Sequence, residues 1–389
     1  MRFAKKLYIY LVYNKLSEYM NILDFAKSVE DFRQPWKVRH LSTDIIFITV
    51  AAVICGAKDW EDVEDFGDCK EEFFNKYLAL PNGIPSHDTF NRFFSSIKPE
   101  VLEKRFGIWV KALCSERSEI ISIDGKTICG AKNEGCSIFH IVSAFCHANG
   151  VSLAQVKTTE KSNEITAIPE LIKVLDLEGC VVTIDAMGCQ REIAKDIINA
   201  KADYVLAVKG NQKELFQGIE DTFRFQRRDD VSFSEELDFG HGRIENRRCY
   251  IATNLEHIDC AKWAGVRTLV KIVSDRYIKR EKRQEESSVR YYISSLNAYS
   301  HRFSNIIRSH WGIENSLHWM LDVSFGEDAS RKRAKNSAMN FSLVFKAALA
   351  MLKKYRVYPN KRDISIKRKR NVGGWSDKHL IAMMGMEID

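Results

Sequence analysis

The stretch that decides the fold of this chain reads Glu119-Ile120-Ile121-Ser122-Ile123-Asp124-Gly125-Lys126-Thr127. Its apolar positions Ile121 and Ile123 alternate with Ser122, and β-branched residues dominate, which predicts a strand with a buried face. Gly125 ends the apolar run, so the strand is expected to stop there. Asp124 is therefore predicted to lie at the tip of a buried strand.

A second stretch repeats this design and reads Val181-Val182-Thr183-Ile184-Asp185-Ala186-Met187-Gly188. Two carboxylates at the tips of two strands of one sheet can hold a hard divalent cation, because Mg²⁺ prefers oxygen ligands and usually keeps several waters. Aspartate followed by glycine is also ordinary turn chemistry, in which the side chain bonds its own backbone. Both interpretations of Asp124 and Asp185 stay open at this point.

The elements between residues 118 and 214 follow a defined order. Strand-like runs at 119–124, 139–147 and 151–158 come first, and Asn149-Gly150 is a strong hairpin signal between the last two. A helix at 164–175, a strand at 181–185, a helix at 190–200 and a strand at 204–208 follow. This is the order of a ribonuclease-H-like sheet, in which the first and fourth strands are neighbours. We therefore expect residues 118–214 to form the first part of an α/β, ribonuclease-H-like catalytic core, with Asp124 and Asp185 facing one cleft.

The region before this core is predicted to be helical. A chain of 389 residues is longer than one hydrophobic core usually organises, so two or three domains are expected. Because apolar positions recur there at helical spacing, residues 1–117 are expected to form an all-helical N-terminal domain. This domain is a candidate for DNA binding. The helix that begins at Thr89 displays Asn91 and Arg92 and is a candidate recognition helix, with an ordinary packed bundle as the alternative. The apolar run 45–57 is too short to cross a bilayer.

The second half of the chain divides into three segments. Residues 215–300 predict a mainly β insertion, residues 301–356 predict core helices that carry a further acid, and residues 357–389 predict a basic tail. The insertion contains Arg243, Arg247, Arg248, Arg276, Lys279, Arg280, Lys282 and Arg283. The tail contains Lys361, Arg362, Lys367, Arg368, Lys369 and Arg370. It is interpreted either as a segment that follows a DNA backbone or as a disordered solubilising segment.

Composition limits the class of protein. The formal net charge is +7 and the pI is about 8.7, which is compatible with an anionic partner but does not establish one. Ten cysteines include no C-x-x-C pair, which favours reduced thiols in a cytoplasmic protein over disulfides or structural zinc. The apolar run after Lys6 is short and lacks a cleavage site, so secretion is not expected. Translation starting at Met1 and translation starting at Met20 both remain open.

A third acid lies in a late stretch that reads Arg308-Ser309-His310-Trp311-Gly312-Ile313-Glu314-Asn315-Ser316-Leu317-His318-Trp319. Helical periodicity is kept despite Gly312, because Trp311, Glu314 and His318 fall on neighbouring turns. A carboxylate among aromatic side chains is costly to bury unless a cation satisfies it. Two alternatives stay open, namely a zinc site of His310, Glu314 and His318, and a structural salt bridge from Glu314 to Arg308.

Four motifs in this order resemble those of the DDE transposases of bacterial insertion sequences, specifically the H-repeat-associated group. They are Ile123-Asp124-Gly125-Lys126, Thr183-Ile184-Asp185-Ala186-Met187-Gly188, Val208-Lys209-Gly210-Asn211-Gln212 and His310-Trp311-Gly312-Ile313-Glu314-Asn315. The resemblance extends to Asn82-Gly83-Ile84-Pro85-Ser86-His87-Asp88-Thr89 and to Leu321-Asp322-Val323. It covers nearly everything from about residue 20 to residue 355.

The resemblance implies that Asp124, Asp185 and Glu314 are the catalytic and metal-binding triad. It also implies Mg²⁺ as cofactor, with Mn²⁺ as a substitute, at two ions per active site. Related transposases carry Tyr, Arg and Lys around this Glu, whereas this chain has Ile307, His310 and Leu321 at those places. His310 could still touch a phosphate, but the missing Tyr and Lys leave open how the DNA end is gripped.

The activity implied by the resemblance is transposition. Water would free a 3′-hydroxyl at the element end, and that hydroxyl would attack target DNA. The expected partner is double-stranded DNA, both at the element ends and at the target. A homodimer is expected to bind it, and no membrane association is expected. Candidate phosphate contacts, each with a solvated surface residue as the alternative, are Lys126, Lys157, Lys161, Lys209, Lys213, Arg308, His310, Lys367, Arg368, Lys369 and Arg370. The alternative functions are a nuclease or resolvase that cuts without joining, and an inactive DNA-binding descendant.

Overall fold

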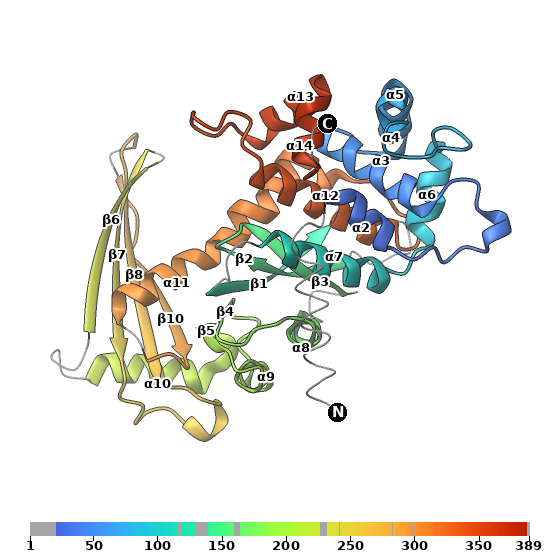
Figure 1. Ribbon diagram of the computed structural model, residues 1–389. Helices are drawn as coiled ribbons and strands as arrows, with labels where there is room; N and C mark the ends of the chain where they lie inside the picture. Colours follow the sequence, from blue (N-terminus) through green and yellow to red (C-terminus); the bar gives the residue numbers. More distant parts are fainter. Residues whose placement is uncertain are drawn as a thin grey trace.

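The computed structural model describes residues 21–114, 119–128, 139–158, 164–225, 232–240, 242–281, 283–297 and 299–386. These residues form a helical region and one large mixed sheet, which meet along the helix α12 (Ser337–Lys354) (Figure 1). Expectations for residues 1–20 and for Lys161 lie outside the described residues.

The helical region combines helices from both ends of the chain. The N-terminal part supplies α2 (Ile22–Ser28), α3 (Ser42–Cys55), α4 (Trp60–Cys69), α5 (Glu71–Phe74), α6 (His87–Ser96) and α7 (Pro99–Leu113). The C-terminal part supplies α12, α13 (Ile366–Trp375) and α14 (Asp377–Met383). The helices α3 and α12 are apolar on almost all sides and pack against each other at the centre, as such helices must. Among the described helices, none combines the length and the apolar character that a membrane span needs.

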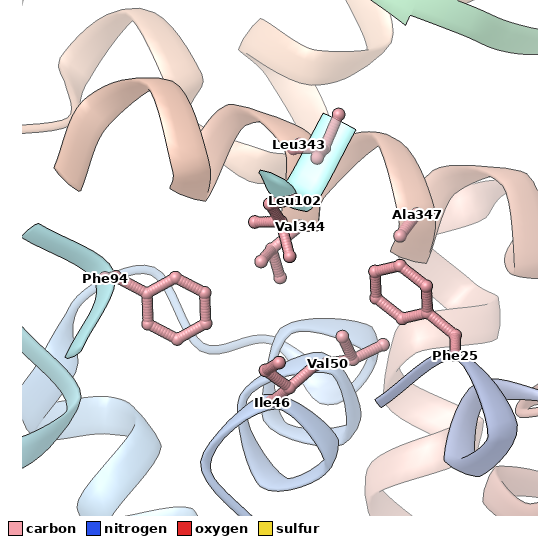
Figure 2. A pocket seen from close by; sticks show the side chains of 8 residues that line it. All are labelled: Phe25, Ile46, Val50, Phe94, Leu102, Leu343, Val344 and Ala347. Atoms are coloured by element: carbon pink, nitrogen blue, oxygen red, sulfur yellow. The ribbon is translucent and has the colours of Figure 1, made fainter. Parts of the chain in front are cut away.

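A small pocket remains where five of these helices meet. Figure 2 shows its lining, which consists of Phe25, Ile46, Val50, Phe94, Leu102, Leu343, Val344 and Ala347. Ligand sites combine apolar walls with a few convergent polar groups. Since every lining side chain here is apolar, the pocket is a packing gap in the core of the helical region.

The C-terminal segment is folded. The helix α13 contacts both α3 and α12, and Ser365 caps it by accepting a hydrogen bond from the backbone N–H of Arg368. The interpretation of this segment as a disordered solubilising tail is therefore wrong for its described residues. A run of basic residues is compatible with a helix whenever part of the run can face its neighbours.

The sheet of the described residues has ten strands. They are β1 (Ile120–Ile128), β2 (Phe139–Cys146), β3 (Val151–Thr158), β4 (Val181–Ile184), β5 (Asp203–Val208), β6 (Ser232–Gly240), β7 (Arg243–Ala252), β8 (Thr268–Ile278), β9 (Arg283–Gln284) and β10 (Ser288–Ser294). The strand order is β3-β2-β1-β4-β5-β10-β8-β7-β6, and β9 pairs with β8. The strand β4 is parallel to both β1 and β5, whereas all other neighbours are antiparallel. The prediction that the first and fourth strands are neighbours is confirmed.

The strand β1 does not stop at Gly125. It pairs with β2 as far as Ile128, whereas its pairing with β4 ends where Ile123 meets Ile184. Asp124 therefore lies in mid-strand, just beyond the end of β4, and the prediction of a strand tip is correct only for Asp185. The antiparallel partner β2 supplies the hydrogen bonds that carry β1 through the glycine.

The expected β insertion continues the central sheet. Its range begins inside α10 (Lys213–Phe225), and β10 then pairs with β5, so that β10, β8, β7 and β6 extend the sheet in one direction. In Figure 1 these strands stand at one end of the molecule and the helical region at the other. The character of this segment is mainly β, as the alternating sequence indicates.

Helices cover both faces of the sheet. The helices α8 (Glu164–Val174), α9 (Arg191–Asn199) and α10 bury one face, which includes Ile121, Ile123, Val182 and Ile184. The helix α11 (Ser300–Ile313) packs on the other face. Because side chains alternate along a strand, Asp124 and Asp185 lie on the face that α11 covers.

Candidate active site

Asp124 and Asp185 are neighbours on two parallel strands. Ile123 and Ile184 are the last pair of the ladder between β1 and β4, so each aspartate is the next residue on its strand. Oδ1 of Asp185 accepts hydrogen bonds from the backbone N–H groups of Met187, at 3.0 Å, and Gly188, at 3.3 Å. The turn interpretation is thus correct for one oxygen of Asp185, whereas the other accepts no hydrogen bond from the described residues.

Several negative charges act on Asp124. Burial and the charges of Asp185, Glu314 and Glu164 raise the pKa of Asp124 to about 7, against a hydrogen bond from the backbone of Gly125. Like charges raise the pKa of a carboxyl group because they disfavour its ionised form. The structure therefore brings Glu314 close enough to the two aspartates for its charge to act on them, although it is distant in the sequence.

Glu314 lies on an irregular part of its helix. After α11 the chain forms a π-helical turn at Glu314–His318 and a second one at Leu321–Phe325. Such turns are rare and are found frequently at functional sites. Partial burial of its carboxyl group and the charge of Asp185 raise the pKa of Glu314, the charge of Arg290 lowers it, and the net direction is upward. The side chain of Glu314 is exposed, whereas those of both aspartates are half-buried.

Two histidines flank Glu314 and contact the sheet. Nδ1 of His310 is 3.0 Å from Oγ1 of Thr183, and Nδ1 of His318 is 3.5 Å from Oδ2 of Asp124. Burial lowers the pKa of His310 to about 4 and the pKa of His318 to about 3, so both rings are neutral near pH 7.

A buried chain of hydroxyl groups continues from His310 across the sheet. Oγ1 of Thr183 is 2.7 Å from Oγ of Ser122, which is in turn 2.7 Å from Nε2 of His147. Ser122 and Thr183 each precede an aspartate by two residues and so share its face. The acids are therefore supported by hydrogen-bonded polar side chains on the same face of the sheet.

Glu164 is a fourth acid near the site. It is the first residue of α8 and is 9% exposed. A Cβ atom at position 125 would lie 2.5 Å from the carboxyl carbon of Glu164. A side chain at position 125 would displace the Glu164 carboxyl group, so the glycine reflects this close approach and not an end of the strand.

The donor set fits a hard divalent cation by its chemistry. Asp124, Asp185 and Glu314 offer carboxylate oxygens, which Mg²⁺ prefers, and their mutual repulsion would be relieved by a cation. Within the part of the chain that is described, no three His, Cys, Asp or Glu side chains are gathered closely enough to hold one ion. The three acids are therefore within range of each other's charges without forming a closed ligand shell. The zinc alternative gains no support, since His310 and His318 face Thr183 and Asp124.

The candidate phosphate contacts fall into exposed and buried groups. Lys157, Lys209, Lys213, Lys367 and Arg368 are exposed. Lys126 is half-buried and pairs with Asp322 and Glu327. Arg308 pairs with Asp238, so the alternative of a salt bridge from Arg308 to Glu314 is wrong.

Lys369 and Arg370 are structural. Nζ of Lys369, which is 1% exposed, donates to the carbonyls of Leu352 and Tyr355 at 2.8 and 2.6 Å and pairs with Asp363. Arg370 donates to the carbonyls of Ser324 and Val53. The expectation that these two residues contact DNA is wrong, because they lie on the inner side of α13.

Sequence reasoning assigns no role to two residues near the acids, and it offers a third, His318, only as a ligand in the zinc alternative. Glu164 and Arg290 carry no motif, and only their positions in the fold bring their charges to the site. His318 has a signal, namely its spacing of four residues after Glu314, but that spacing equally fits a metal ligand. Whether the His318 ring binds a metal or contacts an aspartate depends on where the fold places it relative to β1.

Comparison with known proteins agrees with the motifs. The family described as "Transposase DDE domain" matches residues 115–351, and the family described as "DDE_Tnp_1-associated" matches residues 23–110. "Putative transposase YncI" of Escherichia coli O157:H7 is 45% identical over 362 residues, which cover 90% of each chain. "H repeat-associated putative transposase YhhI" of Escherichia coli strain K12 is 40% identical over 353 residues, which cover 88% of this chain and 92% of the relative.

Among solved structures, the piggyBac transposase synaptic complex with hairpin DNA aligns with a TM-score of 0.45 and 12% identity, over 96% of this chain and 80% of that chain. The assignment of the family rests on the sequence matches. This chain belongs to the family of transposases with a DDE domain, and its relatives include the H-repeat-associated group that its motifs resemble.

Proposed function

We propose that this protein is a cytoplasmic DNA transposase that cleaves at insertion-element ends and joins the 3′-hydroxyl to target DNA by two-metal phosphoryl transfer. The observation that carries the proposal is the approach of Asp124, Asp185 and Glu314, which come from three separate segments, to within range of each other's charges. Membership of the transposase family supports the class of reaction.

The catalytic core in this proposal is ribonuclease-H-like. Support comes from the strand order β3-β2-β1-β4-β5, with β4 parallel to both β1 and β5. Residues 118–214 and 301–356 would form the core, and residues 215–300 the β insertion. Residues 1–117, together with the segment from 357 onward, would form the helical part that contributes to DNA binding.

Asp124, Asp185 and Glu314 would hold the divalent cations. Bound Mg²⁺ or Mn²⁺ ions supply charge stabilisation of the attacking and leaving oxygens of an in-line displacement. The chain's own contribution is placement, because β1 and β4 fix two carboxylates on a rigid sheet while α11 and its π-helical turn deliver the third. Closing the ligand shell around an ion requires the Glu314 side chain to move toward the aspartates.

DNA is the proposed partner, at element ends and at the target, bound by a homodimer that pairs two ends. The exposed cations Lys209 and Lys213 follow the strand β5, whose neighbour β4 ends one residue before Asp185, and they are the favoured phosphate contacts beside the acids. Such contacts position the duplex and make binding depend steeply on salt.

The test uses a donor plasmid that carries the coding gene with its native flanking DNA, a supercoiled target plasmid, and Mg²⁺ or Mn²⁺. Wild-type protein should yield cut donor ends and joined donor–target products. Asp124→Asn, Asp185→Asn and Glu314→Gln should each lose both products, whereas the matched control Asp65→Asn in α4 should keep them. Equal products from wild type and Asp185→Asn would refute the proposal.

The assay also separates the alternative functions. Cut ends without joined products would favour a nuclease or resolvase on the same fold. Binding of element ends without any cutting would favour an inactive descendant. Retention of all three acids argues against the inactive descendant, since an unused cluster of like charges in a half-buried site is costly.

A further inference from the structure

The segment that carries Glu314 is attached to the sheet at two points, one on each side of the acid. His310 lies four residues before Glu314 and His318 four residues after it, so the three side chains project from successive turns. His310 meets β4 at Thr183, and His318 meets β1 at Asp124. The acid is thus held above the two strands whose aspartates it must join.

The contact of His310 with Thr183 is a hydrogen bond, that of His318 with Asp124 is a polar contact at 3.5 Å, and both rings are half-buried. The side chain of His318 is 12% exposed, and its Nε2 is buried without a hydrogen-bond partner among the described residues. The contact of Nδ1 with Asp124 is therefore the one polar interaction that orients this ring within the described part of the chain. His310 is oriented through Thr183, whose hydroxyl is itself fixed by Ser122.

The π-helical turn between the two attachment points also contacts α12. Nζ of Lys353, on α12, donates to the carbonyl of Ser316 at 2.7 Å and to the carbonyl of Gly150 at 2.8 Å. Lys353 thus ties the turn to α12 and to the connection between β2 and β3. Together with the buried side chains of Ile313 and Leu317, this contact anchors the turn to the helical region, and the two histidines link it to the sheet.

We propose that His310 and His318 are positioning residues that dock the Glu314-bearing helix onto β4 and β1, and so set where the Glu314 carboxylate stands relative to Asp124 and Asp185. The inference rests on the proposed function, because it takes these three acids as the cation ligands. In this role the imidazoles neither bind the cation nor touch a phosphate. Groups that orient metal ligands typically change metal affinity by about 10- to 100-fold when they are removed.

The experiment measures Mn²⁺ binding to the full-length, DNA-free protein by electron paramagnetic resonance titration. His310→Leu and His318→Leu remove the polar contact, whereas His310→Asn and His318→Asn keep a polar atom near the position of Nδ1. Thr183→Val and Thr183→Ser test the partner of His310 in the same way. His301→Asn, on an exposed position of the same helix, is the matched control. Circular dichroism and thermal unfolding verify that each variant is folded.

The Leu variants and Thr183→Val should weaken Mn²⁺ binding by about 10-fold or more. The Asn variants and Thr183→Ser should recover most of the affinity, and His301→Asn should match wild type. Spin-echo modulation spectra of the wild-type Mn²⁺ complex should show no coupling to a directly bound imidazole nitrogen. Folded Leu variants with wild-type affinity would overturn the proposal, as would a bound imidazole nitrogen in the spectrum.

Failure of the underlying function gives a different result. If wild-type protein binds no Mn²⁺, or if Asp124→Asn and Glu314→Gln bind it as wild type does, the assignment of the three acids is wrong. If those acid variants lose Mn²⁺ while the folded Leu variants keep it, only the positioning role fails.

Discussion

Nζ of Lys126 lies 2.6 Å from Oε2 of Glu327, a residue that is only 2% exposed. Asp322 contacts the same ammonium group, and Ser342 donates its hydroxyl to Oε1 of Glu327 at 2.6 Å. Because Lys126 follows Asp124 by two residues on β1, this pair fastens the strand of one acid to the segment that comes after Glu314. The charge of Lys126 is thus engaged inside the protein.

Replacing Lys126 should destabilise the fold more than it weakens DNA binding. Lys126→Met leaves Glu327 buried without its cation, which typically costs about 3–5 kcal/mol. The double variant Lys126→Met/Glu327→Gln should recover a large part of the loss, and the exposed control Lys209→Met should stay within about 0.5 kcal/mol of wild type. Chemical denaturation measures all three. A Lys126→Met protein of unchanged stability but much weaker DNA affinity would restore the phosphate-contact interpretation.

Gly312 should resist replacement although it lies within a helix. Alanine normally favours a helix by about 1 kcal/mol over glycine. Here a Cβ atom would lie 2.6 Å from Cε1 and 2.8 Å from Nδ1 of His147, whose ring is held by Ser122. Gly312→Ala should therefore lower the thermal midpoint.

The matched test of this clash repeats Gly312→Ala in a protein that lacks the imidazole ring of His147. In the His147→Ala background, Gly312→Ala should become neutral or stabilising, because only the gain in helix propensity remains. Thermal unfolding followed by circular dichroism measures the four proteins of this cycle. Equal losses from Gly312→Ala in both backgrounds would show that His147 is not the obstacle.

Much of the fold follows from local pattern. Alternation of apolar residues predicts the strands of Asp124 and Asp185, and helical spacing predicts the helix that carries Glu314, because these signals depend only on neighbours in sequence. The continuation of β1 through Gly125 could not be predicted in this way. It depends on the pairing with β2, and the glycine itself is explained by Glu164, which is distant in the sequence.

The parts of the site that the sequence did not reveal are matters of orientation. A spacing of four residues places His310, Glu314 and His318 on one side of a helix, but it does not tell whether the rings face an ion or a strand. The basic run at the C-terminus has the same ambiguity. Lys369 points inward because α13 packs on α12, and nothing in the run of charges distinguishes it from Lys367.

The free energy of unfolding should fall as the pH rises, because Glu103 loses its proton. Oε1 of this residue on α7 is buried without a hydrogen-bond partner among the described residues, and burial raises its pKa to about 7, against Gln155 and the charge of Lys346. The folded state therefore holds the proton more tightly than the unfolded state, whose pKa is about 4.5. This contribution is present in full below about pH 4.5 and is lost as pH rises through about 7.

Glu103→Gln removes that titration. The variant should match wild type near pH 5 and exceed it near pH 8 by about 1–3 kcal/mol, because wild type must then bury a carboxylate. Exposed Glu72→Gln, on α5, is the control, since its charge does not act on Glu103. Denaturation at several pH values measures the difference, and a gain that does not depend on pH would contradict the assignment.

The basic residues of α13 should fall into two groups, one that contacts DNA and one that stabilises the fold. Lys367 and Arg368 are exposed, so Lys367→Ala/Arg368→Ala should leave the thermal midpoint unchanged and weaken binding to duplexes of any sequence. If both contact phosphates, the slope of log affinity against log salt should become shallower by about 2. Lys369→Met should instead lower the thermal midpoint, because the carbonyls of Leu352 and Tyr355 lose their donor. Fluorescence anisotropy at several salt concentrations measures the slope. An unchanged slope in the double variant would mean that α13 does not contact the DNA backbone, and the salt dependence would then have to come from other cations such as Lys209 and Lys213.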